Sequence, residues 1–136
     1  MTRVAVGGLM LCLAMEVGHA CTCVGISNAT AYGRASDVFV GTVLSVKATG
    51  SSIKSRVRIE RSWKGVPAAK VVTVYTSAST CGVGLTVGRE QVVFAHRMTD
   101  GPWKGQLAVS LCSQPHGINV STANDSLGPP ASTSKP

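Results

Sequence analysis

Residues 53–63 read IKSRVRIERSW, and this stretch decides the fold class. Its apolar residues fall on one face of an extended chain: Ile53, Val57, Ile59 and Trp63. Four of its charged residues fall on the opposite face: Lys54, Arg56, Arg58 and Glu60. Successive side chains of a strand point to opposite sides, so this alternation predicts a strand with one buried and one solvated face.

Four neighbouring segments are also predicted strands, because they are short and rich in Val, Leu and Thr. They are residues 38–46, 70–76, 91–95 and 106–112. Residues 28–34 are the exception, a short helix with Ser27 or Asn28 as its N-cap. The spacings are too short for helical crossovers, so the chain is predicted to be all-β. A five-stranded OB-type Greek-key barrel is one such arrangement, and a sandwich stays an open alternative.

The first 20 residues have the organisation of a signal peptide. Arg3 gives a short positive region, residues 4–15 form an apolar core, and Gly18-His19-Ala20 offers the small residues that a signal peptidase reads. The core is too short to span a bilayer, which needs roughly 20 apolar residues. We therefore expect cleavage after Ala20 and a soluble, secreted or periplasmic protein. Lipidation of the next residue, Cys21, is an alternative, although Gly18 replaces the bulky aliphatic residue usual in lipoproteins.

Cleavage would leave four cysteines in the mature chain: Cys21, Cys23, Cys81 and Cys112. An even number of cysteines in an exported chain predicts disulfides, which supplement a modest core. A bond between Cys21 and Cys23 would close a strained ring. Each of the two therefore pairs with Cys81 or Cys112, and both long-range pairings stay open.

Four motifs in order resemble the amino-terminal, netrin-like domain of the tissue inhibitors of metalloproteinases. The predicted mature chain begins Cys21-Thr22-Cys23-Val24. Thr30-Ala31-Tyr32 followed by Ser36-Asp37-Val38 is similar to the family's first helix running into its first strand. Thr80-Cys81-Gly82-Val83 resembles its central cysteine loop, and residues 107–112 resemble its closing strand, which ends Leu-Cys. The resemblance covers about residues 21–113.

The resemblance implies an OB-type, netrin-like barrel with a short helix for residues 21–117, as a reduced, bacterial-type single-domain version of the family. It also implies the disulfides Cys21–Cys81 and Cys23–Cys112.

Two departures from the family pattern matter. The family's third disulfide has no counterpart, because Gly33 stands at its first position and no cysteine follows Cys112. Gly25 and Ile26 stand where the family has prolines, which puts the rigidity of this edge in question.

The resemblance further implies that the chain end inhibits a zinc metalloprotease. The freed α-amino nitrogen and the carbonyl oxygen of Cys21 would chelate the open position of the protease's catalytic zinc and displace its water. Thr22 would enter the pocket beside the zinc. The other implied contact residues are Cys23, Val24, Ser79, Thr80, Gly82 and Val83. The inhibitor would need no cofactor of its own; the alternative is a non-inhibitory secreted netrin-like module that binds another extracellular protein.

Other chemistries have weak support in the sequence. The acidic residues are few and form no Ser-His-Asp or paired-carboxylate arrangement, so an enzyme is not expected. Nucleic-acid binding is not expected either, because the six aromatic residues are too few to provide a stacking surface. His96 and His116 are isolated from other metal ligands in the sequence.

The chain is basic, and its last residues are mostly small or polar. The formal net charge is +7, and Lys54, Arg56 and Arg58 form a basic stripe that is either a solvated outer face or a contact for an acidic partner. Residues 118–136 are rich in Ser, Thr, Pro and Ala, which predicts a disordered tail. We expect a monomer with no membrane contact unless Cys21 is lipidated.

Overall fold

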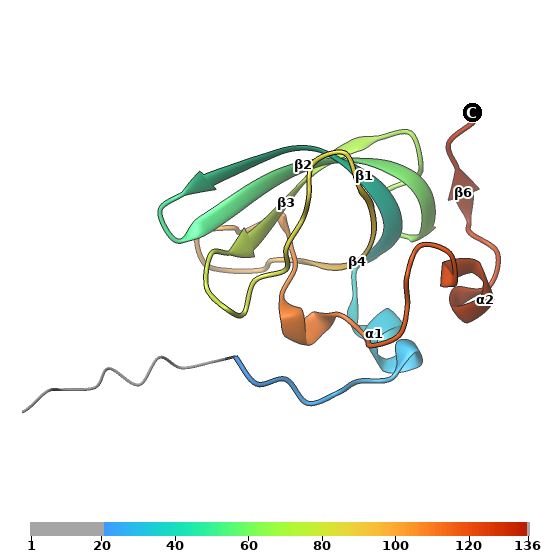
Figure 1. Ribbon diagram of the computed structural model, residues 1–136, viewed down its shortest axis with the longest axis horizontal. Coiled ribbons are helices and arrows are strands. Elements are labelled where there is room, and N and C mark those ends of the chain that lie inside the picture. The colour runs from blue at the N-terminus through green and yellow to red at the C-terminus, as the bar shows by residue number, and fades with distance from the viewer. Residues whose placement is uncertain (1–20, 136) are drawn as a thin grey trace, which may run out of the picture.

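Two long strands, β1 (Asp37–Thr49) and β2 (Ser52–Lys64), form an antiparallel hairpin that is the centre of the fold (Figure 1). The computed structural model describes residues 21–135, so the predicted signal peptide, residues 1–20, lies outside the described part of the chain. Buried positions of β2 alternate with exposed ones: Ser55, Val57 and Ile59 are buried, and Lys54, Arg56 and Arg58 are exposed. The strand predicted over residues 53–63 is therefore confirmed.

Trp63 departs from that alternation. Gly41 pairs with Ile59 and Val40 pairs with Arg61, so Glu60 is an extra residue in β2 between these two pairs. A bulge of this kind reverses the side to which the following side chains point. Trp63 is consequently buried on the opposite face of the sheet from Ile59, and its predicted place on the same face is wrong.

The remaining elements are short. The other strands are β3 (Val71–Ser77), β4 (Glu90–Arg97), β5 (Leu107–Ala108) and β6 (Ser132–Thr133). The helices are α1 (Asn28–Arg34), the 3₁₀ turn η1 (Leu111–Ser113) and α2 (Ala123–Leu127). Ser27 is the N-cap of α1, since its hydroxyl accepts from the Thr30 amide at 3.1 Å. The strand predicted over residues 106–112 is too long, because the Ser110 and Ser113 side chains turn the chain into η1.

The strands form one mixed sheet in the order β1-β4-β5-β3-β2-β6. The β3–β5 pair is parallel and the other pairs are antiparallel. Because β1 pairs with β2 as well as with β4, the pairings of the first five strands lead back to β1. The protein is thus mostly β, with a sixth strand that the sequence does not predict.

Two hydrophobic clusters pack against the sheet, one on each face. The inner core consists of Phe39, Val43, Val57, Ile59, Val74, Val93, Ala95, Leu107 and Val109. The outer core consists of Ala31, Ala35, Val38, Val40, Trp63, Phe94 and Ala123. Val38 and Val40 enter the outer core and Phe39 enters the inner core, which explains the uninterrupted apolar run at residues 38–40. Helix α1 and the tail cover the outer core.

The prediction of a disordered tail over residues 118–136 is wrong for its described part. Ala123 of α2 is fully buried in the outer core, and Trp63 Nε1 donates to the Gly128 carbonyl at 2.8 Å. Strand β6 pairs with Arg61 and Ser62 at an edge of β2 that β3 does not cover. The tail has few large apolar side chains of its own, and these contacts with distant residues hold it in place.

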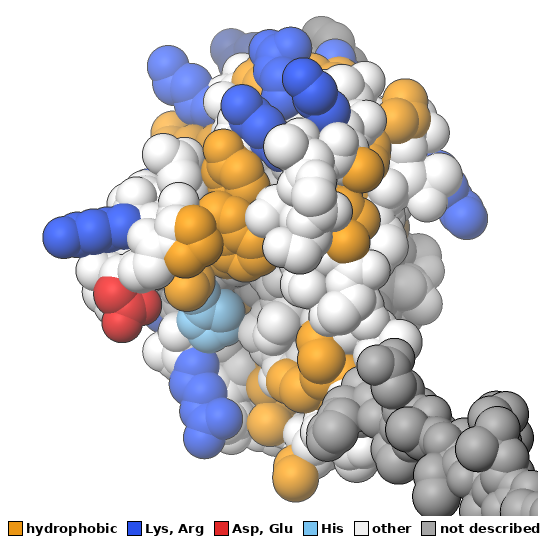
Figure 2. All heavy atoms as spheres, turned by 90° about the vertical axis from the view of Figure 1, so that its left-hand side faces the viewer, with side chains coloured by type: hydrophobic (Ala, Val, Ile, Leu, Met, Phe, Trp, Pro, Cys, Tyr) orange, Lys and Arg blue, Asp and Glu red, His pale blue; other side chains and the backbone are white. Residues whose placement is uncertain are grey.

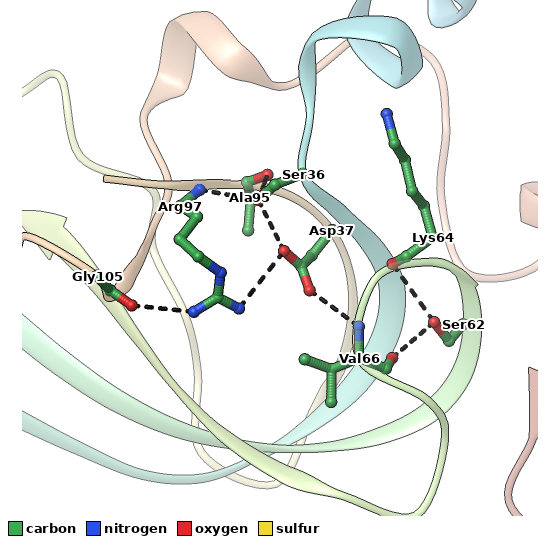
Figure 3. A network of polar contacts seen from close by, with 8 residues as sticks. All are labelled: Ser36, Asp37, Ser62, Lys64, Val66, Ala95, Arg97 and Gly105. Atoms are coloured by element: carbon green, nitrogen blue, oxygen red, sulfur yellow. Dashed lines mark hydrogen bonds and ion pairs between the residues drawn. The ribbon is translucent and has the colours of Figure 1, made fainter. Parts of the chain in front are cut away.

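A polar network around Asp37 fastens the loop after β2 to the start of β1 (Figure 3). The buried Asp37 carboxylate accepts from the Val66 amide at 2.9 Å and from the Ser36 hydroxyl at 2.7 Å. Arg97 Nη2 lies 3.9 Å from its Oδ2. Asp37 therefore joins three segments that are distant in the sequence.

Across the described part of the chain, no helix combines the length and the apolar character needed to cross a membrane.

Candidate functional site

Two disulfides hold the segment that begins at Cys21 against the body of the protein. Cys21 is bonded to Cys81 and Cys23 to Cys112, each with its Cα atoms 5.0 Å apart. The two bridges touch, because the sulfur atoms of Cys21 and Cys112 lie 3.9 Å apart. These pairs are the ones that the family resemblance implies, and they bring residues 21–24 to a loop and to η1.

The side chains of residues 21–24 alternate between the protein and solvent. Cys21 and Cys23 are half-buried and point to their disulfide partners, whereas Thr22 and Val24 are exposed. Val24 is 88% exposed, the largest exposure among the large hydrophobic residues of the described chain. This segment thus presents one polar and one apolar side chain on a backbone that is fixed at both cysteines.

A direct hydrogen bond adds to the bridges at Cys21. Its backbone nitrogen donates to the Thr80 hydroxyl oxygen at 3.2 Å. The sulfur and the nitrogen of Cys21 are therefore both held by adjacent residues of one loop, Thr80 and Cys81. With two attachments on one residue, the position and the direction of its backbone are constrained together.

The loop that receives Cys21 is itself ordered by short-range hydrogen bonds. The Ser79 hydroxyl accepts from the Cys81 amide at 3.3 Å, and the Ser79 carbonyl accepts from the Gly82 amide at 3.0 Å. The Val83 amide donates to Thr76 Oγ1 at 3.0 Å, which connects the loop to the end of β3. These bonds make the loop a rigid support.

Gly82 is required by a close approach of the backbone. A Cβ atom at this position would collide with the carbonyl of Ser77 and would also crowd Ser79. A side chain at position 82 would push the loop away from β3, and with it the attachment points of Cys21.

The structure brings most of the sequence-predicted site residues together. Residues 21–24 and residues 79–82 lie beside one another through the Cys21 bridge and its hydrogen bond. Val83 is different, because it is half-buried and packs against the inner core. Its side chain attaches the loop to the inner core and does not point to solvent with the other predicted contact residues.

Two residues at this edge were not predicted. Leu111 is 42% exposed and its amide donates to the Cys81 carbonyl at 2.8 Å, so η1 also borders the site. His116 lies close to Gly25, since a Cβ there would be 3.7 Å from His116 Cδ2. Leu111 could have been found from the sequence as the neighbour of the half-cystine Cys112, but nothing local in the sequence points to His116.

A group of possible metal ligands at this edge consists of Cys21, Cys23 and Cys112, whose sulfur atoms all lie within 4.8 Å of one another. Thiolates are the form in which cysteines bind metals, and these sulfurs are consumed in disulfides. In the oxidised protein the group is therefore a junction of two bridges.

No protein-family model matches the chain, and a search of curated proteins finds no match either. What this edge does therefore has to be inferred from its own geometry and chemistry.

Proposed function

We propose that this chain is a secreted inhibitor of zinc metalloendopeptidases, of the type that the tissue inhibitors of metalloproteinases represent. The observation that carries the proposal is the double attachment of Cys21, through its bond to Cys81 and its hydrogen bond to Thr80. After cleavage following Ala20, the α-amino nitrogen and the carbonyl oxygen of Cys21 would lie on a backbone that is already fixed.

The chemistry follows from the open coordination position of a catalytic zinc. Such a zinc has three protein ligands and one position for water or substrate. The neutral amine and the carbonyl oxygen of Cys21 would occupy that position as a chelate and displace the water that attacks the peptide bond. The amine binds only without its extra proton, so inhibition weakens as the pH falls below about 7.7–8.0, the usual pKa of an α-amino group.

Fixing the terminus in advance favours tight binding. A flexible terminus would lose conformational freedom when it docks, and that loss would reduce the affinity. Here two bridges and the Thr80 hydrogen bond restrict Cys21 before any partner arrives. Ile26 packs against the outer core, which anchors the segment beyond Gly25 at the place where the family has prolines.

The strand pairings support the OB-type Greek-key barrel that the resemblance implies. Five strands pair in a ring, β1-β2-β3-β5-β4, in which β3 and β5 are parallel. We infer that this ring is a small closed barrel of that type. The same resemblance gives Thr22 as the side chain that enters the protease pocket. It gives Ser79, Thr80, Gly82 and Val83 as the second contact strip.

A non-inhibitory protein-binding module is the alternative, and one observation favours it. Val24 and Leu111 are exposed apolar residues next to the two ends of the Cys23–Cys112 bridge. An apolar edge of this kind suits contact with another protein whether or not a metal is present.

The decisive experiment compares the chain that begins at Cys21 with a variant that carries one additional alanine before Cys21. Both are assayed against a panel of zinc metalloendopeptidases, and their disulfides and melting temperatures are compared as controls. We expect the added residue to weaken inhibition at least about 100-fold, because it removes the free amine from the chelating position.

Equal inhibition by the two forms would contradict the chelation mechanism. Binding of both forms to a protease or to another extracellular protein, without inhibition by either, would support the alternative module. The intact mass of the exported protein provides an additional test, since a lipid-sized excess would show that Cys21 is acylated and its amine is not free.

A further inference from the structure

The outer face of the sheet is only partly covered. Helix α1 and the tail cover the outer core, where Val38, Val40 and Phe94 are buried. Beyond that cover, the hairpin end of β1 and β2 extends from the body of the protein (Figure 1). On this end Lys and Arg side chains gather beside a group of hydrophobic side chains (Figure 2).

The strand register places three cations on this uncovered area. Lys47 of β1 is paired with Lys54 of β2, and Arg56 lies two residues further along the same face. All three are exposed. The ion pairs of residues 21–135 are Arg58–Glu60 and Arg97–Asp37, so these three cations have no acidic partner within the described chain. Two like charges directly opposite one another destabilise a strand pair, which indicates that they serve a purpose other than folding.

An aromatic pair lies next to these cations. Lys54 is paired with Tyr75 of β3, and Tyr75 is paired in turn with Ala108 of β5. The Trp103 ring stacks on Tyr75, with their ring centroids 5.7 Å apart. Trp103 also lines a cavity of about 240 Å³, together with His96, Met98, Ala108, Val109 and Ser110. Two of these six residues, His96 and Ser110, have polar side chains.

We propose that this surface, the cation–aromatic face formed by Lys47, Lys54, Arg56, Tyr75 and Trp103, binds an acidic polypeptide segment that carries one large apolar side chain. The unpaired cations attract carboxylates, and the apolar cavity beside Trp103 accepts the apolar side chain as an anchor.

The cavity and the aromatic pair disfavour other anionic polymers. A sugar would leave most of its hydroxyl groups without partners in a cavity whose polar side chains are His96 and Ser110. A nucleic-acid strand stacks successive bases on several aromatic rings, whereas this surface has two, and they are stacked on each other. A polypeptide supplies carboxylates and an apolar anchor in one chain.

The register also sets the spacing within the ligand. Lys54 on β2 and Ala108 on β5 are separated by one strand, β3, so they lie about 10 Å apart across the sheet. Lys47 lies one strand further. An extended peptide rises about 3.3 Å per residue, so the carboxylates belong about three to five residues from the apolar side chain.

The test uses a short fluorescein-labelled peptide with one central Phe and with Glu about three to five positions away on both sides. Its binding to the disulfide-bonded protein is measured by fluorescence anisotropy, beside a matched peptide with Gln in place of Glu. We expect the Gln peptide to bind about tenfold more weakly and salt to weaken the Glu peptide.

Variants of the protein locate the binding site. The double variant Lys54→Glu/Arg56→Glu should weaken the Glu peptide about tenfold, and Trp103→Ala about fivefold. The matched control, Arg89→Glu/Lys135→Glu, changes the net charge equally at exposed positions elsewhere and should change binding less than about twofold. Lys54→Gln/Arg56→Gln repeats the test without charge reversal, and circular dichroism confirms that each variant is folded.

Three results would overturn the proposal. One is equal weakening by the cation–aromatic face variant and by its control. Another is equal binding of the Glu and Gln peptides. The third is tighter binding of oligothymidylate or alginate than of the Glu peptide, which would assign the surface to another class of polymer.

Discussion

Asp37 shows how much of this fold depends on one buried carboxylate. It accepts hydrogen bonds from the Val66 amide and the Ser36 hydroxyl, and Arg97 lies beside it (Figure 3). The adjacent Gly65 has a φ of +82°, and a Cβ there would collide with the Asp37 carboxylate. The loop after β2 therefore approaches β1 this closely because residue 65 is a glycine and because Asp37 accepts from the Val66 amide.

Replacing this carboxylate should be among the most damaging single changes in the protein. We expect Asp37→Ala to lower the free energy of unfolding by about 2–4 kcal/mol, because the Val66 amide and the Arg97 guanidinium lose their buried partner. Urea unfolding followed by circular dichroism measures the change. Asp37→Asn is the control, since its amide oxygen can still accept from Val66 and its loss should be smaller. A stability of Asp37→Ala within about 0.5 kcal/mol of the wild type would show that the network contributes little.

At the scale of elements, the tail protects an exposed edge of the sheet. Strand β3 pairs with β2 as far as Arg58, and beyond it the backbone of β2 is met by the tail. The Ser134 amide donates to the Glu60 carbonyl at 2.7 Å, and its hydroxyl donates to Glu60 Oε2 at 2.7 Å. An uncovered strand edge is a site for pairing with other chains, so this short strand closes a point of aggregation.

The contact between the tail and Glu60 should depend on pH. The hydrogen bond from Ser134 is the largest cause that lowers the pKa of Glu60 below its ordinary value of 4.5, with further contributions from Arg58 and Thr42. A carboxyl group whose pKa is lowered by folding stabilises the protein above its unfolded-state pKa, and this stability is lost as the pH falls through the lower, folded-state value. Acid should therefore loosen the tail.

Ser134→Ala tests this coupling. We expect the variant to have a free energy of unfolding about 1 kcal/mol lower than that of the wild type at neutral pH. Well below pH 4.5, where Glu60 is protonated in both proteins, this difference should be smaller. Urea unfolding and hydrogen exchange of the tail amides, each measured at both pH values, provide the comparison. Thr133→Ala, an exposed change at the preceding residue, is the control. If the variant and the wild type differ equally at both pH values, Glu60 ionisation is not coupled to the tail.

At the scale of the whole molecule, the sheet and the amino-terminal edge are stabilised in different ways. The sheet is built around the inner and outer cores, whereas residues 21–24 are attached through the two disulfides and one hydrogen bond. These bridges close sequence separations of 60 and 89 residues. Bridges over such distances act mainly by restricting the unfolded chain.

Removing one bridge should therefore lower stability but leave the sheet intact. We expect Cys23→Ser with Cys112→Ser to lower the free energy of unfolding by about 2–5 kcal/mol, with an unchanged far-ultraviolet circular dichroism spectrum. Changing both partners avoids a free thiol. Hydrogen exchange should show that the loss of protection is concentrated in residues 21–27. Loss of the sheet spectrum in this variant would mean that the bridge is needed for the fold itself.

A strand and a helix were determined by the sequence itself, because they depend on near neighbours. The alternation over residues 53–63 gave a correct strand, and the position of Ser27 before residues 28–34 gave a correct helix with its cap. The even number of cysteines indicated disulfides, and the resemblance supplied the pairs that the structure contains. The edge formed by residues 21–24 and the loop at 79–82 followed from those pairs.

Other features were decided only by the tertiary structure. The side on which Trp63 packs depends on the bulge at Glu60, which exists only because of how β2 pairs with β1. The order of the tail depends on Trp63, Arg61 and Glu60, which are partners about 60–75 residues away and leave no local pattern. The neighbours Lys54 and Tyr75 share a face only because β2 and β3 pair in one register. Local periodicity indicates which side of a chain is apolar. The contacts described here join distant segments and form only when the sheet is assembled, so no local pattern indicates them.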